Sequence, residues 1–357
     1  MTTRLALTAA TLFTAVTTVH AEGIAVVAPQ SGPYAVLGEQ IRDGAAAAAA
    51  AVGKNIFLIN ESCEPGSSED IATRIIEAGV DVAIGFLCSE SLDGGLPALA
   101  EAKIPAITVS VRWKGLMEDA LKHGWPFFRL APAPEDEAEK LIDVILATWP
   151  GAPFALVEDG TIRGRELVDA VRAGLEERGL KPVFVDTFRP GQEQQIALVR
   201  RLQKAGATHV LVGGDRNDVA TIARDAATES VPLTIIGGDA MRAVDQPVPL
   251  ADGVLAVTLP DYANEPTAAK AVEALRAVGV EPEGYVLPAH AAVEIALAAA
   301  AIAAEEKRPI AEVLAGERFP AAIGTIGFGS DHELADNPYR LLEWRGGAFT
   351  TPAPQGQ

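Results

Sequence analysis

The sequence predicts an α/β protein built as two doubly wound parallel-sheet lobes with a ligand cleft between them. Short apolar runs alternate with helical stretches in two successive rounds. The runs show little period-two alternation, which is typical of parallel strands buried on both faces. A helix between consecutive strands indicates βαβ units. The chain of 357 residues is long enough for two such lobes.

The individual elements follow from the same pattern. The expected strands begin at Gly23, Asn55, Val80 and Ile104 in the first round, and at Phe154, Pro182, His209, Leu233 and Gly253 in the second. The expected helices cover residues 43–52, 68–78, 165–178 and 194–205, and a glycine, a common helix stop, follows each of them. A later alanine-rich helix is expected over residues 288–304, where an internal glutamate and a charged run that follows argue against a membrane span. The segment from Ile323 predicts a bend and then an edge strand.

The first residues have the pattern of a cleaved secretion signal. Arg4 supplies a positive charge, residues 5–16 are apolar and uncharged, and residues 19–21 place small side chains at the positions read for cleavage. We therefore expect residues 1–21 to be a signal peptide and the mature protein to be periplasmic. A membrane anchor is the alternative, but the apolar stretch is short and lacks a basic flank.

Charge and motifs exclude several classes of function. The formal net charge of −19 disfavours nucleic acids and anionic membranes as partners. The sequence contains no GxSxG, HExxH, P-loop or GxGxxG motif, so we expect no enzyme activity. The four histidines that follow the signal, at positions 123, 209, 290 and 332, lack metal-ligand spacing, and we expect neither a metal nor a cofactor.

Two cysteines, Cys63 and Cys88, are present in the whole chain. In an oxidising compartment a single pair is expected to form a disulfide. Two free, buried thiols are the alternative.

Ligands of open α/β sheets bind beyond the carboxyl ends of the strands. This rule nominates residues 30–37, 61–65, 87–90, 108–113, 159–164, 213–216 and 238–241. If the strand ends of two lobes face each other, closing the lobes excludes water from a ligand between them. Each nominated residue also has an ordinary alternative: Ser89 as a helix cap, Asp239 as a turn residue, Arg112 and Arg163 as surface cations.

Several of these segments carry a resemblance to a known family. They are SGPYAVLG from Ser31, the cysteine-containing segment from Glu61 to Ser91, IPAITVSV from Ile104, GGDRNDVATIARDA from Gly213, IIGGDAM from Ile235, GYVLPAHAAVEIALAA from Gly284 and IGTIGFGSDHE from Ile323. The sequence resembles the Leu/Ile/Val-binding branch of type I periplasmic binding proteins, whose members serve ABC importers of hydrophobic amino acids and amides. The resemblance covers nearly all of the chain after the signal.

The resemblance implies a domain organisation. The N-terminal lobe would comprise residues 22–131 and 261–327, and the C-terminal lobe residues 132–260 and 328–357. Three crossings near Ala131, Asp261 and Phe328 would act as hinges of a monomer that closes on its ligand.

The resemblance also implies site residues. The carboxylate of a bound amino acid would be held by Ser89, Ser110 and Arg112, and its ammonium by Asp239. Leu37, Arg163 and Asp215 stand at positions where the family usually has aromatic rings, and Arg112 replaces a hydroxyl. Arg163 and Asp215 would contact the ligand or pair with each other. These substitutions predict a polar or charged amino-acid-like ligand in place of an aliphatic one.

We therefore expect the solute-binding component of an ABC importer, with a membrane permease as its partner. A periplasmic sensor that presents the solute to a receptor or regulator is the alternative, because both roles use the same lobes. An enzyme on the same scaffold is the third possibility, disfavoured by the absence of a catalytic motif. The sequence alone identifies neither the ligand nor its affinity.

Overall fold

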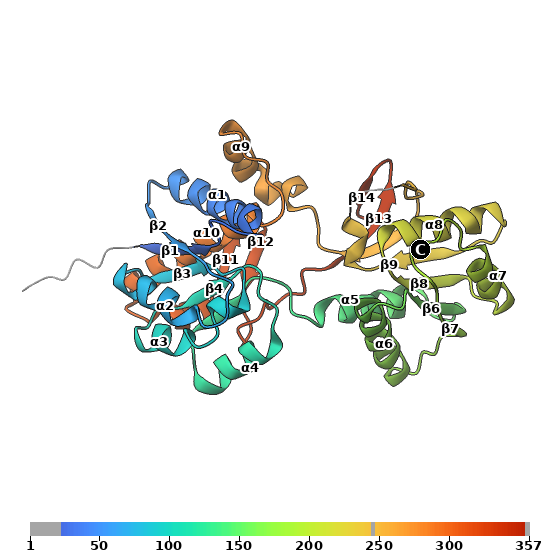
Figure 1. The fold of residues 1–357 in the computed structure, drawn as a ribbon, viewed down its shortest axis with the longest axis horizontal. Helices are drawn as coiled ribbons and strands as arrows, with labels where there is room; N and C mark the ends of the chain where they lie inside the picture. The colour runs from blue at the N-terminus through green and yellow to red at the C-terminus, as the bar shows by residue number, and fades with distance from the viewer. Residues whose placement is uncertain (1–22, 244–246, 354–357) are drawn as a thin grey trace, which may run out of the picture.

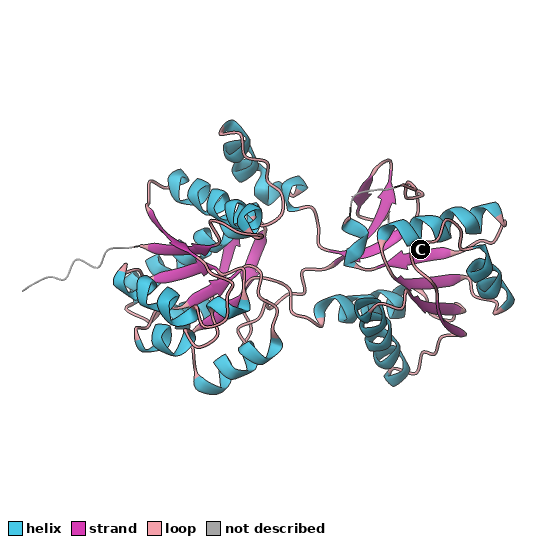
Figure 2. Cartoon of the chain, viewed as in Figure 1, coloured by secondary structure: helices cyan, strands magenta, loops and turns pink. Residues whose placement is uncertain are grey.

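A computed structural model describes residues 23–243 and 247–353 of the protein. The expected signal peptide, residues 1–21, lies outside the described residues. The chain forms two α/β lobes side by side, joined by several extended segments (Figure 1). Both lobes are layered, with helices on the two faces of a central sheet (Figure 2).

Within the described ranges, the sheet of the N-terminal lobe has five parallel strands in the order β2-β1-β3-β4-β5. They are β1 (Ile24–Ala28), β2 (Ile56–Asn60), β3 (Val82–Gly85), β4 (Ala106–Thr108) and β5 (Phe127–Arg129). Alternate residues of β1 face opposite cores: Val26 packs with the long helices α1 (Ala35–Ala51) and α10 (Val286–Glu306), and Val27 packs with the helices of the other face. Those helices are α2 (Ser68–Glu77), α3 (Leu96–Glu101) and α4 (Lys114–His123). Burial on both faces explains why the strand sequences are apolar throughout.

The same lobe is completed by chain that returns from the other lobe. This part contains α9 (Ala269–Ala277), α10, α11 (Ile310–Gly316) and the antiparallel hairpin of β11 (Arg318–Ala321) and β12 (Gly324–Gly327). Among the described residues, α10 is the one helix long and apolar enough to cross a membrane. Its residues are largely buried against α1 and the sheet, as in the core helix of a globular lobe.

The described strands of the C-terminal lobe form a sheet in the order β14-β13-β10-β9-β8-β6-β7. The parallel part comprises β6 (Phe154–Glu158), β7 (Phe184–Thr187), β8 (His209–Gly213), β9 (Thr234–Gly237) and β10 (Leu255–Thr258). β13 (Arg340–Arg345) and β14 (Ala348–Thr350) add an antiparallel edge. Helices α5 (Asp136–Thr148) and α6 (Ile162–Glu177) cover one face, and α7 (Ile196–Lys204) and α8 (Arg216–Thr228) cover the other. This lobe therefore has the expected parallel sheet, and β13 is the edge strand expected from the final segment.

The chain crosses between the lobes three times. Two of the crossings lie near the expected positions, and the third lies later in the sequence than expected. The chain leaves the first lobe after β5 and returns between β10 and the short helix at Tyr262–Asn264. Phe328, expected at the third crossing, belongs to the N-terminal lobe: it pairs with Leu334 and packs against Phe128. The chain enters the second lobe only before Tyr339, whose ring is buried in that lobe's core. The reason for the shift is that a buried aromatic side chain ties residues 328–334 to the first lobe.

Candidate ligand-binding cleft

Ser89 begins a short helix, Ser89–Ser91, just after β3. Gly85 and Phe86 both have positive φ values, of 106° and 56°, so the strand ends in a sharp turn that presents the following loop. A buried phenylalanine in this conformation is strained by about 1–3 kcal/mol and persists only where its surroundings fix it. The Cys63–Cys88 disulfide is one of the fixing contacts, which confirms the expected pairing, and its Cα atoms are 5.4 Å apart.

Glu61 is the second contact that fixes this loop. Its buried carboxylate accepts hydrogen bonds from the backbone N–H groups of Leu87, at 2.9 Å, and Cys88, at 3.0 Å. It also accepts one from the hydroxyl of Ser91, at 2.5 Å. Burial raises the pKa of Glu61, and these hydrogen bonds oppose the rise. Glu61 and the disulfide thus hold the carboxyl end of β2 against the loop that carries Ser89.

The next loop, after β4, carries Ser110 and Arg112. The hydroxyl of Thr108 shapes it by accepting hydrogen bonds from the N–H groups of Ser110, at 3.2 Å, and Val111, at 2.9 Å. The hydroxyl of Ser110 lies 3.0 Å from that of Tyr285, at the start of α10. Sequence reasoning missed Tyr285, although it lies in one of the segments that carry the family resemblance.

Arg112 reaches from this loop toward the second lobe. Its guanidinium donates to the Tyr339 hydroxyl over 3.4 Å. Burial works to lower the pKa of Arg112, but Tyr339 and, after it, Asp239 raise this pKa above its usual value. Burial raises the pKa of Tyr339 to about 12, with the charge of Asp239 adding to the rise, so the phenol is un-ionised at neutral pH. Tyr339 was not singled out from the sequence, because nothing local marks a tyrosine in a crossing segment as part of a site.

Asp239 follows β9 in the second lobe and is held from three directions. Its Oδ1 accepts hydrogen bonds from the Thr258 hydroxyl, at 2.7 Å, and from the Leu259 N–H, at 3.2 Å. Its own N–H donates to Glu137 Oε1 over 2.8 Å. A carboxylate held in this way has one oxygen committed to the protein and the other available to a ligand cation.

Glu137, in the first turn of α5, links two of the predicted site residues. Besides the backbone of Asp239, its carboxylate pairs with Arg163, the distance from Nη2 to Oε2 being 3.1 Å. Arg163 therefore pairs with Glu137, and not with Asp215 as in one of the two alternatives left open by the sequence. Glu137 carried no sequence signal, because an acidic residue in the first turn of a helix is ordinary.

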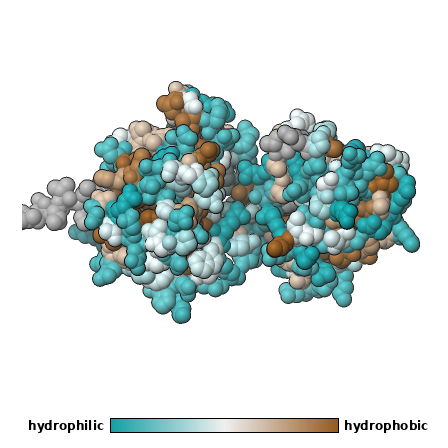
Figure 3. Space-filling view, viewed as in Figure 1, coloured by the Kyte–Doolittle hydropathy of each residue, from teal (hydrophilic) through white to brown (hydrophobic). Residues whose placement is uncertain are grey.

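A cavity of about 250 Å³ lies at the carboxyl ends of β6, β8 and β9. Its polar lining consists of Glu137, Asp159, Thr161, Arg163 and Asp215. Glycines form much of the remaining wall, and a Cβ added at Gly238 would overlap the Glu137 carboxylate. This cavity belongs to the second lobe, and the space-filling surface is hollowed where the two lobes meet (Figure 3).

The structure brings most of the predicted residues toward one region. Arg112 lies within reach of the charge of Asp239, and Arg163 and Asp215 line the cavity beside Asp239. Ser89 and Ser110 lie at the ends of neighbouring strands, β3 and β4. Leu37 is half-buried in the first turn of α1, beyond the carboxyl end of β1.

The arrangement of the cleft agrees with a comparison with known families. A family model described as "Periplasmic binding protein" matches residues 23–348. The chain belongs to this family. Membership of the periplasmic binding protein family supports two expectations from the sequence: a role in solute binding and a periplasmic location.

Curated relatives align with this binding protein over nearly their whole length. "Leu/Ile/Val-binding protein homolog 3" of Brucella melitensis is 25% identical over 339 residues, which cover 91% of each chain. The "Leucine-, isoleucine-, valine-, threonine-, and alanine-binding protein" of Pseudomonas aeruginosa is 22% identical over 342 residues, covering 92% of this chain and 91% of that protein.

Solved structures show the same fold. A Rhodospirillum rubrum protein, described as a candidate branched-chain amino acid ABC transporter, matches with a TM-score of 0.79 at 18% identity, covering 93% of this chain and all of that one. A solute-binding protein of Rhodopseudomonas palustris in complex with p-hydroxybenzoic acid matches with a TM-score of 0.62 at 15% identity, covering 92% and 94% of the two chains. A Streptococcus pneumoniae substrate-binding protein in complex with isoleucine matches with a TM-score of 0.59 at 17% identity, covering 92% and 97% of the two chains, so the fold is shared by proteins described with chemically different ligands.

Proposed function

We propose that this protein captures a polar, amino-acid-like solute by closing its two lobes and delivers it to the permease of an ABC importer. The proposal is carried by Arg112 of the first lobe, which donates to Tyr339 of the second-lobe core and lies within reach of the charge of Asp239. A zwitterion complements such a pair, because its carboxylate fits a guanidinium fork and its ammonium fits a carboxylate.

The lining of the second-lobe cavity supports a polar ligand in place of an aliphatic one. Asp159 and Asp215 border it together with the Glu137–Arg163 pair. Thr161 already donates to Asp159 through its N–H and its hydroxyl, but burying the Asp215 carboxylate beneath an aliphatic side chain would cost several kcal/mol. A ligand with hydrogen-bond donors on its side chain would supply a partner to Asp215.

A role in capture needs no chemistry at the site. Arg112, Ser110 and Asp239 are arranged to hold charged groups and hydroxyls, and the structure places no nucleophile beside a general base among them. We propose a monomer that opens and closes about the crossings before Pro134, Asp261 and Tyr339. A ligand that binds only the closed form then stabilises the protein by RT ln(1 + [L]/Kd), which keeps rising with the concentration of free ligand.

Calorimetric titration of the purified protein with acidic, basic, amide and aliphatic amino acids tests the proposal. We expect a polar amino acid to bind tightest, and small-angle scattering at saturation to show a more compact particle. Arg112→Ala is expected to weaken this binding, with Lys114→Ala as the matched control, because Lys114 is an exposed cation two residues further along that pairs with Glu135. Tightest binding of leucine, isoleucine or valine would contradict the polar specificity.

A further inference from the structure

The second-lobe cavity, at the carboxyl ends of β6, β8 and β9, has a wall whose polar groups are mostly carboxylates. Glycines at positions 164, 213, 214 and 238 add no side chain to this wall, and a Cβ at Gly164 would overlap the Asp159 carboxylate. The volume of about 250 Å³ gives room for about eight atoms of the size of a water molecule. The carboxylates therefore decide which chemical group can enter.

Two of the three carboxylates already have partners in the protein. Asp159 accepts hydrogen bonds from the N–H of Thr161, at 2.9 Å, and from its hydroxyl, at 2.6 Å. Glu137 accepts from the N–H of Asp239 and pairs with Arg163. Arg163, the one cation among the described residues that line the cavity, is thereby engaged. These contacts explain Asp159 and Glu137 as parts of the fold.

Asp215 is the third carboxylate, and its contacts do not explain it. It stands just before α8, where an aspartate ordinarily accepts a hydrogen bond from an N–H of the first turn. Its carboxylate makes no such bond, and it has no ion pair or other hydrogen bond within the described part of the chain. The residue is exposed, on the wall of the cavity. Asp215 is therefore a charge at the ligand-binding edge of the sheet that the fold itself does not use.

The charge around the cavity is negative. Burial raises the pKa of Asp218, in the first turn of α8, and the like charges of Asp215 and Asp159 add to the rise. Arg242 follows β9 closely but borders a different cavity, together with Asp261, Glu281 and Glu283. Negative charge beside Asp215 is therefore left without a cation.

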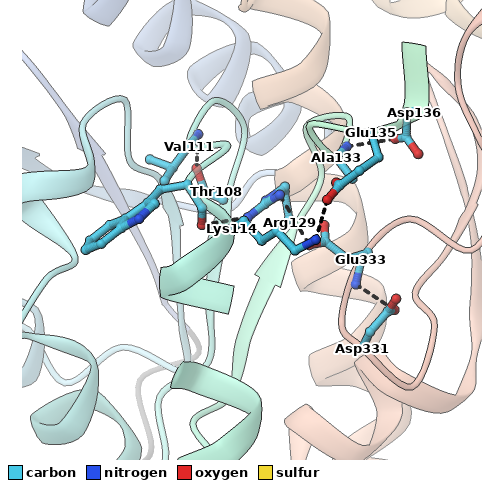
Figure 4. A network of polar contacts seen from close by, with 10 residues as sticks. Thr108, Val111, Lys114, Arg129, Ala133, Glu135, Asp136, Asp331 and Glu333 are labelled. Carbon is cyan, nitrogen blue, oxygen red and sulfur yellow. Dashed lines mark hydrogen bonds and ion pairs between the residues drawn. The ribbon is translucent and has the colours of Figure 1, made fainter. Parts of the chain in front are cut away.

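The space between the lobes is acidic as well. A cavity of about 570 Å³ lies between α4, the start of α5 and residues 331–337. Carboxylates of both lobes border it, and Figure 4 shows Glu135, Asp136, Asp331 and Glu333. The cation Lys114 is engaged by Glu135, at 2.6 Å. The buried Arg129 is engaged by Glu333, at 3.2 Å. A cleft lined by one sign of charge raises the local concentration of the opposite charge, so both cavities favour a cation.

We propose that the solute carries a cationic side chain, a guanidinium or an alkylammonium, and that Asp215 binds this group. The inference rests on the proposed function, in which Arg112 and Asp239 hold the carboxylate and the ammonium of the ligand. It adds that the further polar group of the ligand is positively charged.

Closing the lobes removes water from the Asp215 carboxylate. A neutral polar side chain replaces that water with a hydrogen bond alone. A cation replaces it with a hydrogen bond and an opposite charge, and their attraction strengthens as water leaves. An acidic side chain brings a like charge into a cavity that is already negative. The expected order of affinity is therefore basic, then neutral amide, then acidic amino acids.

Calorimetric titration with arginine and citrulline tests the inference, because these amino acids have side chains of the same length and similar hydrogen-bond donors but differ in charge. The proteins are the wild type, Asp215→Asn, and the control Glu166→Gln, an exposed carboxylate of α6 outside the cavity. We expect the wild type to bind arginine about tenfold tighter than citrulline, and Asp215→Asn to bind the two within about twofold of each other. Glu166→Gln should keep the preference of the wild type.

Asp215→Asn is expected to fold, because the carboxylate supports no contact of the fold. Equal binding of arginine and citrulline by the wild type would overturn the inference and leave the proposed function standing. A preference for arginine that Asp215→Asn retains in full would overturn it as well.

In a second arm, the same proteins are titrated with agmatine, which is arginine without its carboxylate. Binding of agmatine that Asp215→Asn weakens, together with no binding of any amino acid, would contradict the proposed function and support the cation site. Absence of binding of both arginine and agmatine would overturn the inference, whichever other amino acid binds.

Discussion

The guanidinium of Arg112, from the first lobe, donates to the hydroxyl of Tyr339, 3.4 Å away in the segment that enters the second lobe. This contact ties a predicted ligand residue to a hinge segment. Removing the hydroxyl with Tyr339→Phe keeps the buried ring and removes the acceptor. We expect weaker ligand binding by about 1 kcal/mol with little change in stability, as for the loss of one hydrogen bond. Calorimetry and thermal unfolding of the same sample separate the two effects.

Arg112→Ala should weaken binding of the tightest-binding amino acid by about 2–5 kcal/mol, because it leaves the ligand carboxylate buried without its partner. Arg112→Lys should recover part of the loss, since an ammonium keeps the charge but lacks the fork geometry. Equal affinities of the wild type and Arg112→Ala would show that the guanidinium does not touch the ligand.

Asp239 depends on the hydroxyl of Thr258 for its orientation. Asp239→Asn removes the charge and should weaken binding of an α-amino acid by about 2–5 kcal/mol. Thr258→Val keeps the charge and the shape of the neighbour but removes the hydrogen bond, so a loss of about 1 kcal/mol is expected. The order of the two losses, measured by calorimetry, is the test: a larger effect of Thr258→Val would argue against a direct contact of Asp239 with the ammonium.

The Cys63–Cys88 disulfide closes the loop that presents Ser89. Replacing both cysteines by serine should lower the free energy of unfolding by about 2–4 kcal/mol, as judged from urea denaturation. Reduction of the wild type should produce a loss of similar size. If the double mutation lowers the free energy of unfolding but reduction of the wild type does not, the effect comes from packing of the sulfur atoms and not from the covalent bond.

Glu61 accepts hydrogen bonds from two backbone N–H groups in the same loop. Glu61→Gln turns one acceptor into a donor that faces an N–H, so a loss of stability of about 1–3 kcal/mol is expected. Glu64→Gln, an exposed change in the same turn, is the control and should change stability by less than about 0.5 kcal/mol. Denaturant titration of the three proteins provides the comparison.

The pKa of Glu333 is raised from 4.5 to about 7, so its proton is held more tightly in the folded than in the unfolded protein. Its contribution to stability is therefore fully present below about pH 4.5 and is lost as the pH rises through about 7. The shift corresponds to roughly 3 kcal/mol, reduced to about 2 kcal/mol by partial solvent screening.

Denaturant titrations between about pH 5 and pH 8.5 test this sign. Burial also raises the pKa of Glu61 and Glu137, so the stability of the wild type alone does not isolate Glu333. The informative quantity is the difference in the free energy of unfolding between Glu333→Gln and the wild type. As the pH rises, the variant should become increasingly more stable relative to the wild type. A difference that does not vary with pH would show that Glu333 titrates normally.

The sequence by itself determined the parallel cores and the order of strands and helices, because periodicity and glycine stops are local signals. The runs from Gly23 and Phe154 became β1 and β6, buried on both faces. The cysteine pair also followed from the sequence, since each of the two cysteines has one possible partner within the chain. Strand ends were predicted as ligand-binding positions for a topological reason, and the assignment of Arg112 and Asp239 to the ligand stays a prediction.

Only the tertiary structure decided which groups hold these residues in place. Glu137 lies 102 positions from Asp239 in the chain and binds its N–H, and Arg129 meets Glu333 only because residues 328–334 fold back onto the first lobe. Such contacts join residues distant in sequence and leave no local periodicity. The third crossing was placed too early for the same reason: burial of Phe328 against Phe128 is decided by packing between segments that a single sequence does not pair.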